Sequence, residues 1–249
     1  MIVEIPRWTN AKMEINKKEI LNPISQDIKH NELRFVHNIF PYYGYITNYG
    51  ALPQTWEDPN KLDELTQLKG DNDPLDVCEI GSVKQKRGSV IGVKVLGALG
   101  LIDEGETDWK IIVIDHTDEL AAHINTMKDV EMKLPGLMES IRDWFKIYKI
   151  PSGKPANTFA FNGNYLERES AINLIEHNHK AWLELFKQNN NNNTNRNDIS
   201  LFNSTLTNNN TISTEQANSI INQSKKIQEY AQFDSELIDK LCYVNRNIK

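Results

Sequence analysis

The sequence is short of the residues that define several large classes of protein. Only two of its 249 residues are cysteines, Cys78 and Cys242, so we expect reduced thiols in a cytoplasmic protein rather than a disulfide framework. No apolar run approaches the roughly eighteen residues of a membrane span. Basic residues (28) are outnumbered by acidic ones (34), and the net charge of −6 argues against a nucleic-acid binder, which would need a basic face. An acid at Glu4 and a proline at Pro6 make a signal peptide unexpected.

An asparagine-rich tract divides the chain. Between residues 188 and 210, eleven of 23 residues are asparagine, and such a segment has too little apolar surface to order itself. We therefore expect one compact domain over residues 1–187, a disordered linker over residues 188–213 and a weakly helical tail over residues 214–249.

The pattern of the first 187 residues is mixed α+β and mainly β. Stretches rich in Val and Ile predict strands at residues 77–80, 89–102 and 109–115, and three glycines in the second predict bends or bulges. Helical spacing of apolar residues predicts one helix after Gly136 and another over about residues 165–186. Several short strands with two helices suggest an OB-like, closed five-stranded β-barrel with flanking strands.

Two acidic turns carry the strongest chemical signal. Residues 70–77 (GDNDPLDV) crowd three carboxylates into one tight turn, and residues 103–110 (DEGETDWK) repeat the pattern. Neither turn contains His or Cys, and all-oxygen ligands favour hard divalent cations, with Mg²⁺ first and Mn²⁺ as an alternative. We expect a hairpin to set Asp103 opposite Asp108 at the mouth of such a site. This chemistry is typical of proteins that act on phosphate esters and anhydrides.

Other interpretations of the first turn are weaker. An EF-hand loop fails because its glycine position holds Asp76 and its twelfth position holds Ser82. An aspartyl-phosphate phosphatase requires a buried apolar strand before the motif, where this chain has QLKG. A solvated acidic loop stays open for the first turn alone, and the second turn makes it less attractive. Taken singly, Arg34, Tyr45 and Lys149 are more often structural than catalytic.

Together these segments resemble the family I soluble inorganic pyrophosphatases of eukaryotic type. The signature D-x-D-P-x-D stands at residues 71–76, and residues 3–12 (VEIPRWTNAK), 40–45, 103–110 and 147–151 (IYKIP) match in order. The resemblance covers about residues 2–187. Only two residues precede Val3, where eukaryotic members carry an extension, and the asparagine-rich tract replaces their usual C-terminal sequence.

The resemblance implies a role for each matching residue. It implies metal ligands at Asp71, Asp76, Asp103 and Asp108, with Glu14 at a further ion. It implies substrate binding by Lys12, Arg34, Tyr148 and Lys149, supported by Tyr49 and Lys110. It also implies that Asp73 takes the proton of the attacking water and that Tyr45 donates a proton to the leaving phosphate.

The expected function is therefore Mg²⁺-dependent hydrolysis of pyrophosphate to two orthophosphates by a homodimer. Two alternatives stay open at this point. One is a pyrophosphatase-like subunit that binds the substrate with little turnover. The other is an OB-like nucleic-acid-binding module, which would need a basic groove with exposed aromatic residues and is disfavoured by the acidic charge.

Overall fold

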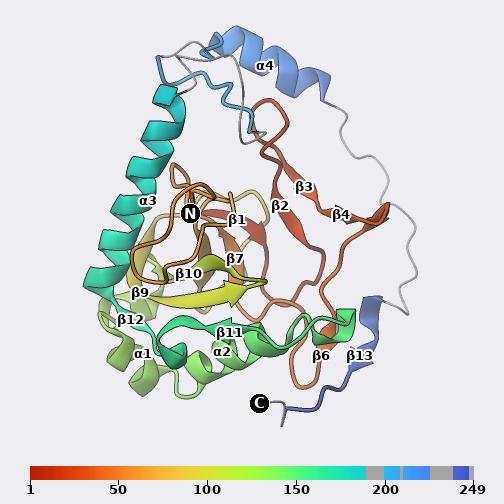
Figure 1. Cartoon of the computed structure of the whole chain (residues 1–249), viewed down its shortest axis with the longest axis vertical. Helices are drawn as coiled ribbons and strands as arrows, with labels where there is room; N and C mark the ends of the chain where they lie inside the picture. Colours follow the sequence, from red (N-terminus) through yellow and green to blue (C-terminus); the bar gives the residue numbers. More distant parts are fainter. Residues whose placement is uncertain (189–198, 208–209, 225–237, 247–249) are drawn as a thin grey trace.

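A computed structural model describes residues 1–188, 199–207, 210–224 and 238–246. A seven-stranded mixed sheet forms its centre, with strand order β1-β7-β8-β10-β9-β11 and β12 also paired to β9 (Figure 1). Its strands are β1 (Ile2–Ile5), β7 (Asn48–Ala51), β8 (Asp76–Glu79), β9 (Val93–Asp103), β10 (Glu106–Asp115), β11 (Thr158–Phe159) and β12 (Leu166–Glu167).

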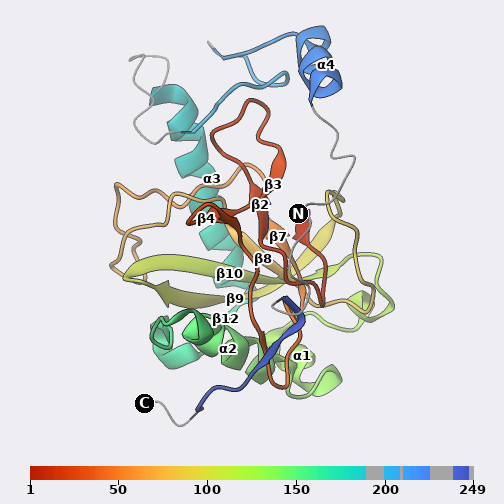
Figure 2. The same ribbon diagram turned by 90° about the vertical axis from the view of Figure 1, so that its right-hand side faces the viewer.

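Short strands and the α-helices of the described residues lie around this sheet (Figure 2). Two-stranded pairs join β2 (Met13–Ile15) to β3 (Ile24–Gln26), β4 (Ile28–Lys29) to β5 (Glu32–Leu33), and β6 (Asn38–Ile39) to β13 (Leu241–Cys242). The α-helices of the described residues are α1 (Met127–Lys133), α2 (Leu137–Ile147), α3 (Arg168–Gln188) and α4 (Thr214–Gln223). None of them combines the length and the apolar character that crossing a bilayer demands.

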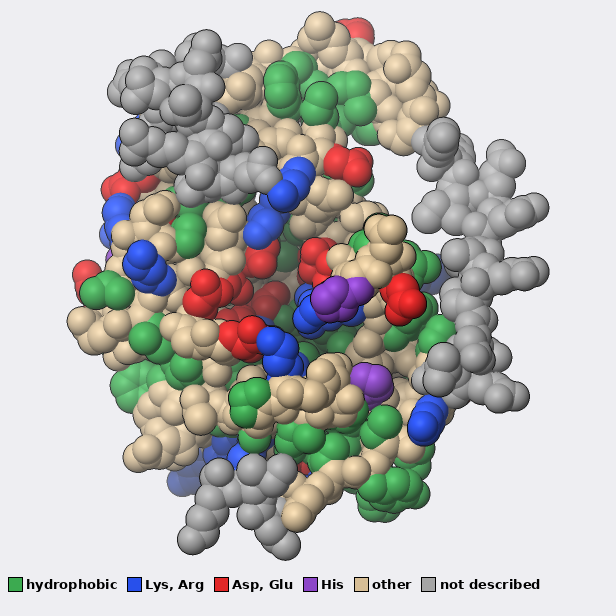
Figure 3. Space-filling model, turned by 45° about the vertical axis from the view of Figure 1, so that its right-hand side comes forward, with side chains coloured by type: hydrophobic (Ala, Val, Ile, Leu, Met, Phe, Trp, Pro, Cys, Tyr) green, Lys and Arg blue, Asp and Glu red, His purple; other side chains and the backbone are tan. Residues whose placement is uncertain are grey.

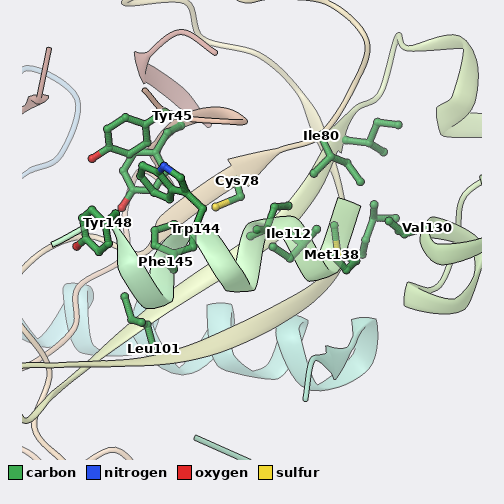
Figure 4. Packing of buried hydrophobic residues seen from close by; sticks show 14 of the residues in the cluster. Tyr45, Cys78, Ile80, Leu101, Ile112, Val130, Met138, Trp144, Phe145 and Tyr148 are labelled. Atoms are coloured by element: carbon green, nitrogen blue, oxygen red, sulfur yellow. The ribbon is translucent and has the colours of Figure 1, made fainter. Parts of the chain in front are cut away.

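Alternation along β10 sends its side chains to two separate cores. Ile112 and Ile114 point into a cluster with Ile141 and Trp144 of α2, part of which Figure 4 shows. Trp109, Ile111 and Val113 point to the other face, where Ala171 and Leu174 of α3 cover them. Because residues two apart in a strand share a face, Asp108 and Lys110 lie on the α2 side with Ile112.

The closed five-stranded barrel is not found among the described residues. Closure would need β1 to pair with the far edge of the sheet, but that edge of β1 is bonded to the loop before β9. Val3 N donates to Ser89 O (2.9 Å) and Gly88 N donates to Val3 O (2.7 Å). At the other end, β9 pairs with β11 and β12. The α+β, mainly β class is confirmed, whereas the OB-like closure that the sequence suggested is not.

The expected elements are otherwise mostly present, with differences in number and register. The predicted bend in the second strand exists as a bulge, because Gly97 pairs with Ile112 while Val95 pairs with Val113. The expected pairing of Asp103 with Asp108 is wrong: Asp103 pairs with Glu106, and Asp108 pairs with Leu101. The second helix begins at Arg168 rather than near Tyr165, and α1 was not expected.

Described segments of the C-terminal part of the chain contact the core near α3 and at β6. Ile199 and Leu201 are buried against Trp56 and α3. Leu241 and Cys242 form β13, which runs parallel to β6. The first half of the asparagine-rich tract, residues 189–198, lies outside the described residues. The described segment after it packs against the core, which differs from a linker without packing contacts.

Candidate active site

Lys110 lies at the centre of the site because of the register between two strands. β8 and β10 run parallel with Asp76 beside Lys110, and Asp108 precedes Lys110 by two residues on the same face. Lys110 Nζ lies 2.5 Å from Asp76 Oδ2 and also contacts an Asp108 oxygen. The side chain is only 2% exposed, so these carboxylates supply the charge partners that its burial requires.

The two carboxyl groups beside Lys110 titrate in opposite directions. Burial alone would raise the pKa of Asp76, but Lys110 and Lys12 outweigh it and lower that pKa. For Asp108, burial dominates and raises the pKa to about 7, although Lys110 opposes the shift. Tyr49 donates its hydroxyl to Asp76, which adds to the stabilisation of the Asp76 anion.

The first acidic turn is held by backbone hydrogen bonds. Asp73 N donates to Asp71 Oδ1 (2.9 Å), so the first aspartate caps its own turn. Glu57 N donates to Asp73 O (2.8 Å) and Asn72 N donates to Glu57 O (3.0 Å), which ties the turn to the preceding loop. Asn72 has a left-handed backbone with φ of 68°, a conformation that asparagine tolerates better than most residues.

Carboxylate oxygens of Glu57, Asp71 and Asp108 lie within 4.8 Å of one another. Burial, followed by repulsion from neighbouring carboxylates, raises the pKa of both Glu57 and Asp71 well above the usual range. Glu57 Oε1 accepts from Trp109 N (3.0 Å), while Glu57 Oε2 is buried with no hydrogen-bond partner among the described residues. No spacing pattern in the sequence marks Glu57 as part of the site.

The second acidic turn reaches the site through another lysine. Lys149 Nζ lies 2.6 and 2.5 Å from the two carboxylate oxygens of Asp103, at the end of the β9–β10 hairpin. Lys149 follows α2 and Asp103 ends β9, so this contact joins the helix end to the hairpin.

Further charged side chains of the site come from the segment around β2. Lys12 Nζ lies 3.3 Å from Glu14 Oε2, as expected for residues two apart on a strand face. Arg34 Nη1 donates to Asp27 Oδ2 (2.8 Å), which fixes one side of its guanidinium. Asp73 pairs with Lys17, a residue that the sequence interpretation missed.

Three tyrosines form the wall between the charged groups and the α2 core. Tyr45 packs against Tyr49 and Trp144, with ring centroids 4.8 Å apart in each case. Tyr148 stacks on Trp144 at 5.0 Å, and Figure 4 shows Tyr45 and Tyr148 at the same end of this cluster. Burial raises the pKa of all three phenols, so they stay protonated at neutral pH and can donate hydrogen bonds.

Most of these groups line one cavity of about 190 Å³, whereas Glu57, Asp27 and Lys17 are outside its lining. Acidic and basic side chains gather about a hollow on the face shown in Figure 3. The cavity brings together all thirteen residues that the sequence predicted: Lys12, Glu14, Arg34, Tyr45, Tyr49, Asp71, Asp73, Asp76, Asp103, Asp108, Lys110, Tyr148 and Lys149. It is also lined by Glu4, which was not predicted and whose pKa is raised to about 8 by burial and then by Asp76.

The donor set fits hard divalent cations. Among the described residues that line the cavity there is neither His nor Cys, and the donors are carboxylate oxygens. Crowded carboxylates repel one another, and Lys110 and Lys149 neutralise only part of that charge. The unpartnered Glu57 Oε2 adds a buried oxygen that a cation or its hydration shell would satisfy.

Comparison with known proteins identifies the family. A model of the family described as inorganic pyrophosphatase matches residues 1–183. The chain belongs to the inorganic pyrophosphatase family. An inorganic pyrophosphatase of Debaryomyces hansenii is 51% identical over 245 residues, which span 98% of this chain and 83% of the relative.

Solved structures of family members agree with this assignment. The inorganic pyrophosphatase of Schistosoma japonicum superposes with a TM-score of 0.83 at 45% identity, over 98% of this chain and 85% of that one. A truncated vacuolar soluble pyrophosphatase of Trypanosoma cruzi, in complex with PPi, gives a TM-score of 0.71 at 45% identity, over 75% of this chain and 69% of that one. The eukaryotic pyrophosphatase resemblance that the motifs suggested is confirmed.

Proposed function

We propose that the protein hydrolyses inorganic pyrophosphate to two orthophosphate ions in a reaction that depends on Mg²⁺. The observation that carries this proposal is the cavity in which the carboxylates of both acidic turns meet lysine and arginine side chains from distant segments. Membership of the inorganic pyrophosphatase family and the PPi complex of the Trypanosoma cruzi relative support it. We assign the catalytic unit to residues 1–187.

We assign the metal ligands to Asp71, Asp76, Asp103 and Asp108, with Glu14 at a further ion; Mn²⁺ suits the same oxygens. Bound divalent ions would neutralise the polyanionic substrate and make a water molecule more acidic. Without them, a pyrophosphate ion would meet a field dominated by carboxylates. At about 4 Å and an effective dielectric constant near 20, each like-charge contact costs about 4 kcal/mol.

The cationic residues then bind and orient the substrate. Lys12, Arg34 and Lys149 would bind phosphoryl oxygens, and Tyr148 would donate its hydroxyl to them. Asp27 binds Nη1 of Arg34, and Arg34 lines the cavity. The other N–H groups of its guanidinium are therefore the ones that would bind substrate there. Lys110 and Tyr49 both contact Asp76, and we propose that they act on the substrate mainly by holding that carboxylate.

Two groups would move protons. Asp73 lies in the acidic turn and lines the cavity, where its carboxylate would accept the proton of the attacking water. Tyr45 is buried beside Tyr49 and keeps its proton at neutral pH, so it can donate to the oxygen of the leaving phosphate. The leaving group is itself a stable anion, so a weak acid is sufficient.

The test is release of orthophosphate from pyrophosphate with Mg²⁺, with Mn²⁺, and with EDTA followed by restored Mg²⁺. We expect turnover with either ion, its loss in EDTA and its recovery. Binding of pyrophosphate without release of phosphate would indicate a catalytically weak binding subunit. Binding of oligonucleotides without either result would indicate the nucleic-acid module.

We also propose a cytoplasmic homodimer. Trp8 (58% exposed), Phe40 and Tyr43 are exposed, and Trp8 and Tyr43 border a groove with Leu134 and Leu137. Exposed aromatic residues beside an apolar groove are typical of contact surfaces between protein chains. Light scattering of the purified protein would measure the mass of the assembly.

A further inference from the structure

Lys17, in the loop between β2 and β3, is bonded to the first acidic turn. Lys17 Nζ contacts the Asp73 carboxylate and also donates to Asn72 O (2.7 Å). A lysine that meets a carboxylate and a backbone carbonyl of the same turn is fixed by two partners. Its position therefore determines where the Asp73 side chain points.

Trp56 makes a second contact with this turn. Trp56 Nε1 donates to Asn72 Oδ1 (3.0 Å), and the indole is buried. Asn72 is thus bonded through its side chain to Trp56 and through its carbonyl oxygen to Lys17. These two hydrogen bonds hold Asn72, the residue between Asp71 and Asp73.

Lys17 and Trp56 both contact the same short segment, residues 199–201, from the far end of the chain. Ile199 and Leu201 pack with Trp56, Ala181 and Leu185 in one buried cluster. Ser200, between them, donates its backbone N–H to the carbonyl oxygen of Lys17 at 2.6 Å. Figures 1 and 2 show this segment beside the loop that joins β2 to β3.

The loop that carries Lys17 is bound to this segment by a further residue. Asn22 Nδ2 lies 3.2 Å from both Lys17 O and Ser200 O, so one side-chain amide bridges the two segments. None of residues 199–201 lines the cavity, and their described contacts with Lys17 and Trp56 connect them to the acidic turn.

We propose that Lys17 is a positioning residue for Asp73 and that residues 199–201 hold Lys17 in place. The inference rests on the proposed pyrophosphate hydrolysis, in which Asp73 accepts a proton from water. An ion pair with partly exposed side chains adds little to stability, so its effect should be on geometry and therefore on turnover. A displacement of about 1 Å at a reacting group can reduce the rate by about a hundredfold.

The first test compares Lys17→Met with Lys17→Arg. Met keeps the apolar stem and removes the ammonium group, whereas Arg keeps a cation that can reach both partners. We expect kcat for pyrophosphate to fall about tenfold or more in Lys17→Met, with KM within about threefold of the wild type. Lys17→Arg should recover most of kcat.

The matched control is Lys29→Met, which removes the same charge from an exposed lysine close enough to influence Glu104 near the cavity. It should leave kcat and KM near the wild-type values. An equal loss in Lys29→Met, or a higher KM with unchanged kcat in Lys17→Met, would show that Lys17 acts through general electrostatics and would overturn the inference.

The second test addresses the supporting segment. Ser200→Pro removes the N–H that donates to Lys17, while Ser200→Ala keeps it. Ser200 Oγ is buried without a hydrogen-bond partner among the described residues, so the alanine variant should match the wild type. We expect Ser200→Pro to lower kcat by about threefold or more, again with little change in KM.

Wild-type turnover separates the possible failures. If the wild type releases no phosphate from pyrophosphate, the proposed function is wrong. If the wild type is active while Lys17→Met and Ser200→Pro both keep kcat within twofold, the function stands and the positioning role is wrong. Melting temperatures measured on every variant identify any that do not fold. If Lys17→Met does not fold, the comparison of Ser200→Pro with Ser200→Ala decides. If Ser200→Pro does not fold, the comparison of Lys17→Met with Lys17→Arg decides.

Discussion

Asp76 holds more of the site together than its size suggests, since it contacts the Tyr49 hydroxyl and the Lys110 ammonium and lies beside Lys110 in the sheet. We expect Asp76→Asn to lower kcat by more than the roughly 10²–10³-fold that is typical of losing one electrostatic donor. The amide keeps the shape and loses the charge that a shared cation ligand must supply. Steady-state rates at saturating Mg²⁺ would measure this, and retention of most of the wild-type rate would remove Asp76 from the metal site.

Arg34 provides a prediction in which charge is conserved and geometry is not. Arg34→Lys should lower kcat/KM by about tenfold or more, because a planar fork can bind Asp27 and a phosphoryl oxygen together and an ammonium group cannot match that geometry. Arg168→Lys, at an exposed position outside the cavity, is the control. Near-normal kinetics of Arg34→Lys would place Arg34 outside the substrate site.

Single residues were predictable where a dense motif carried them. The two acidic turns identified their carboxylates because several charges fall within eight residues. Glu57, Glu4 and Lys17 were missed because none of them belongs to a turn with several carboxylates, and Glu57 beside Asp58 or Lys17 beside Lys18 is ordinary for a solvated loop. Only the folded chain brings Glu57 beside Asp71 and Lys17 beside Asp73.

At the scale of elements, α1 provides a stability prediction. Thr126 Oγ1 accepts from Asp129 N (3.1 Å) and Asp129 accepts in return from Thr126 N, which forms a capping box. Thr126→Ala should lower the free energy of unfolding by about 1 kcal/mol, while Thr126→Ser should keep most of it. Chemical denaturation would measure both, and an equal loss in the two variants would show that the cap is not the cause.

Helices with many turns were predictable and short or paired elements were less so. Apolar residues at helical spacing predict α2 and α3. In contrast, α1 has seven residues and too few turns to show a period. The hairpin register was wrong because the turn contains two residues. Glu104 and Gly105 both have positive φ, as a type I′ turn requires, and this turn sets Asp103 opposite Glu106.

At the scale of the whole molecule, the site should make stability depend on pH when metal is absent. Burial raises the pKa of Glu4 to about 8 and that of Asp108 to about 7. The folded protein therefore keeps protons that the unfolded chain releases above its ordinary carboxyl pKa values. This contribution is complete at low pH and is lost as the pH rises through 7 to 8.

We accordingly expect the melting temperature in EDTA to fall between pH 5.5 and 8.5 and Mg²⁺ to reduce the fall. Glu4→Gln should show a shallower decline in EDTA, because the amide oxygen can still accept from Ile15 N while nothing titrates. An unchanged slope in Glu4→Gln would mean that Glu4 is not a source of the pH dependence.

The overall architecture was predictable only in class. Strand-forming stretches and two long helices gave a mixed α+β chain, but closure of a sheet depends on which edges meet. The loop at residues 88–91 bonds to β1 and two short strands, β11 and β12, occupy the edge of β9. None of these pairings has a local sequence signal, so the barrel could not be decided from periodicity.

The sheet order has a consequence for how quickly the chain can fold. β1 pairs with β7 and β8 pairs with β10, so the strands that carry the site join residues far apart in the sequence. Non-local pairings are slow to form, and here each productive encounter also brings carboxylates toward one another. We expect divalent cations to accelerate refolding as well as to support turnover. Stopped-flow refolding with Mg²⁺ and with EDTA at matched ionic strength would measure this, and equal rates would show that the carboxylates meet only after the rate-limiting step.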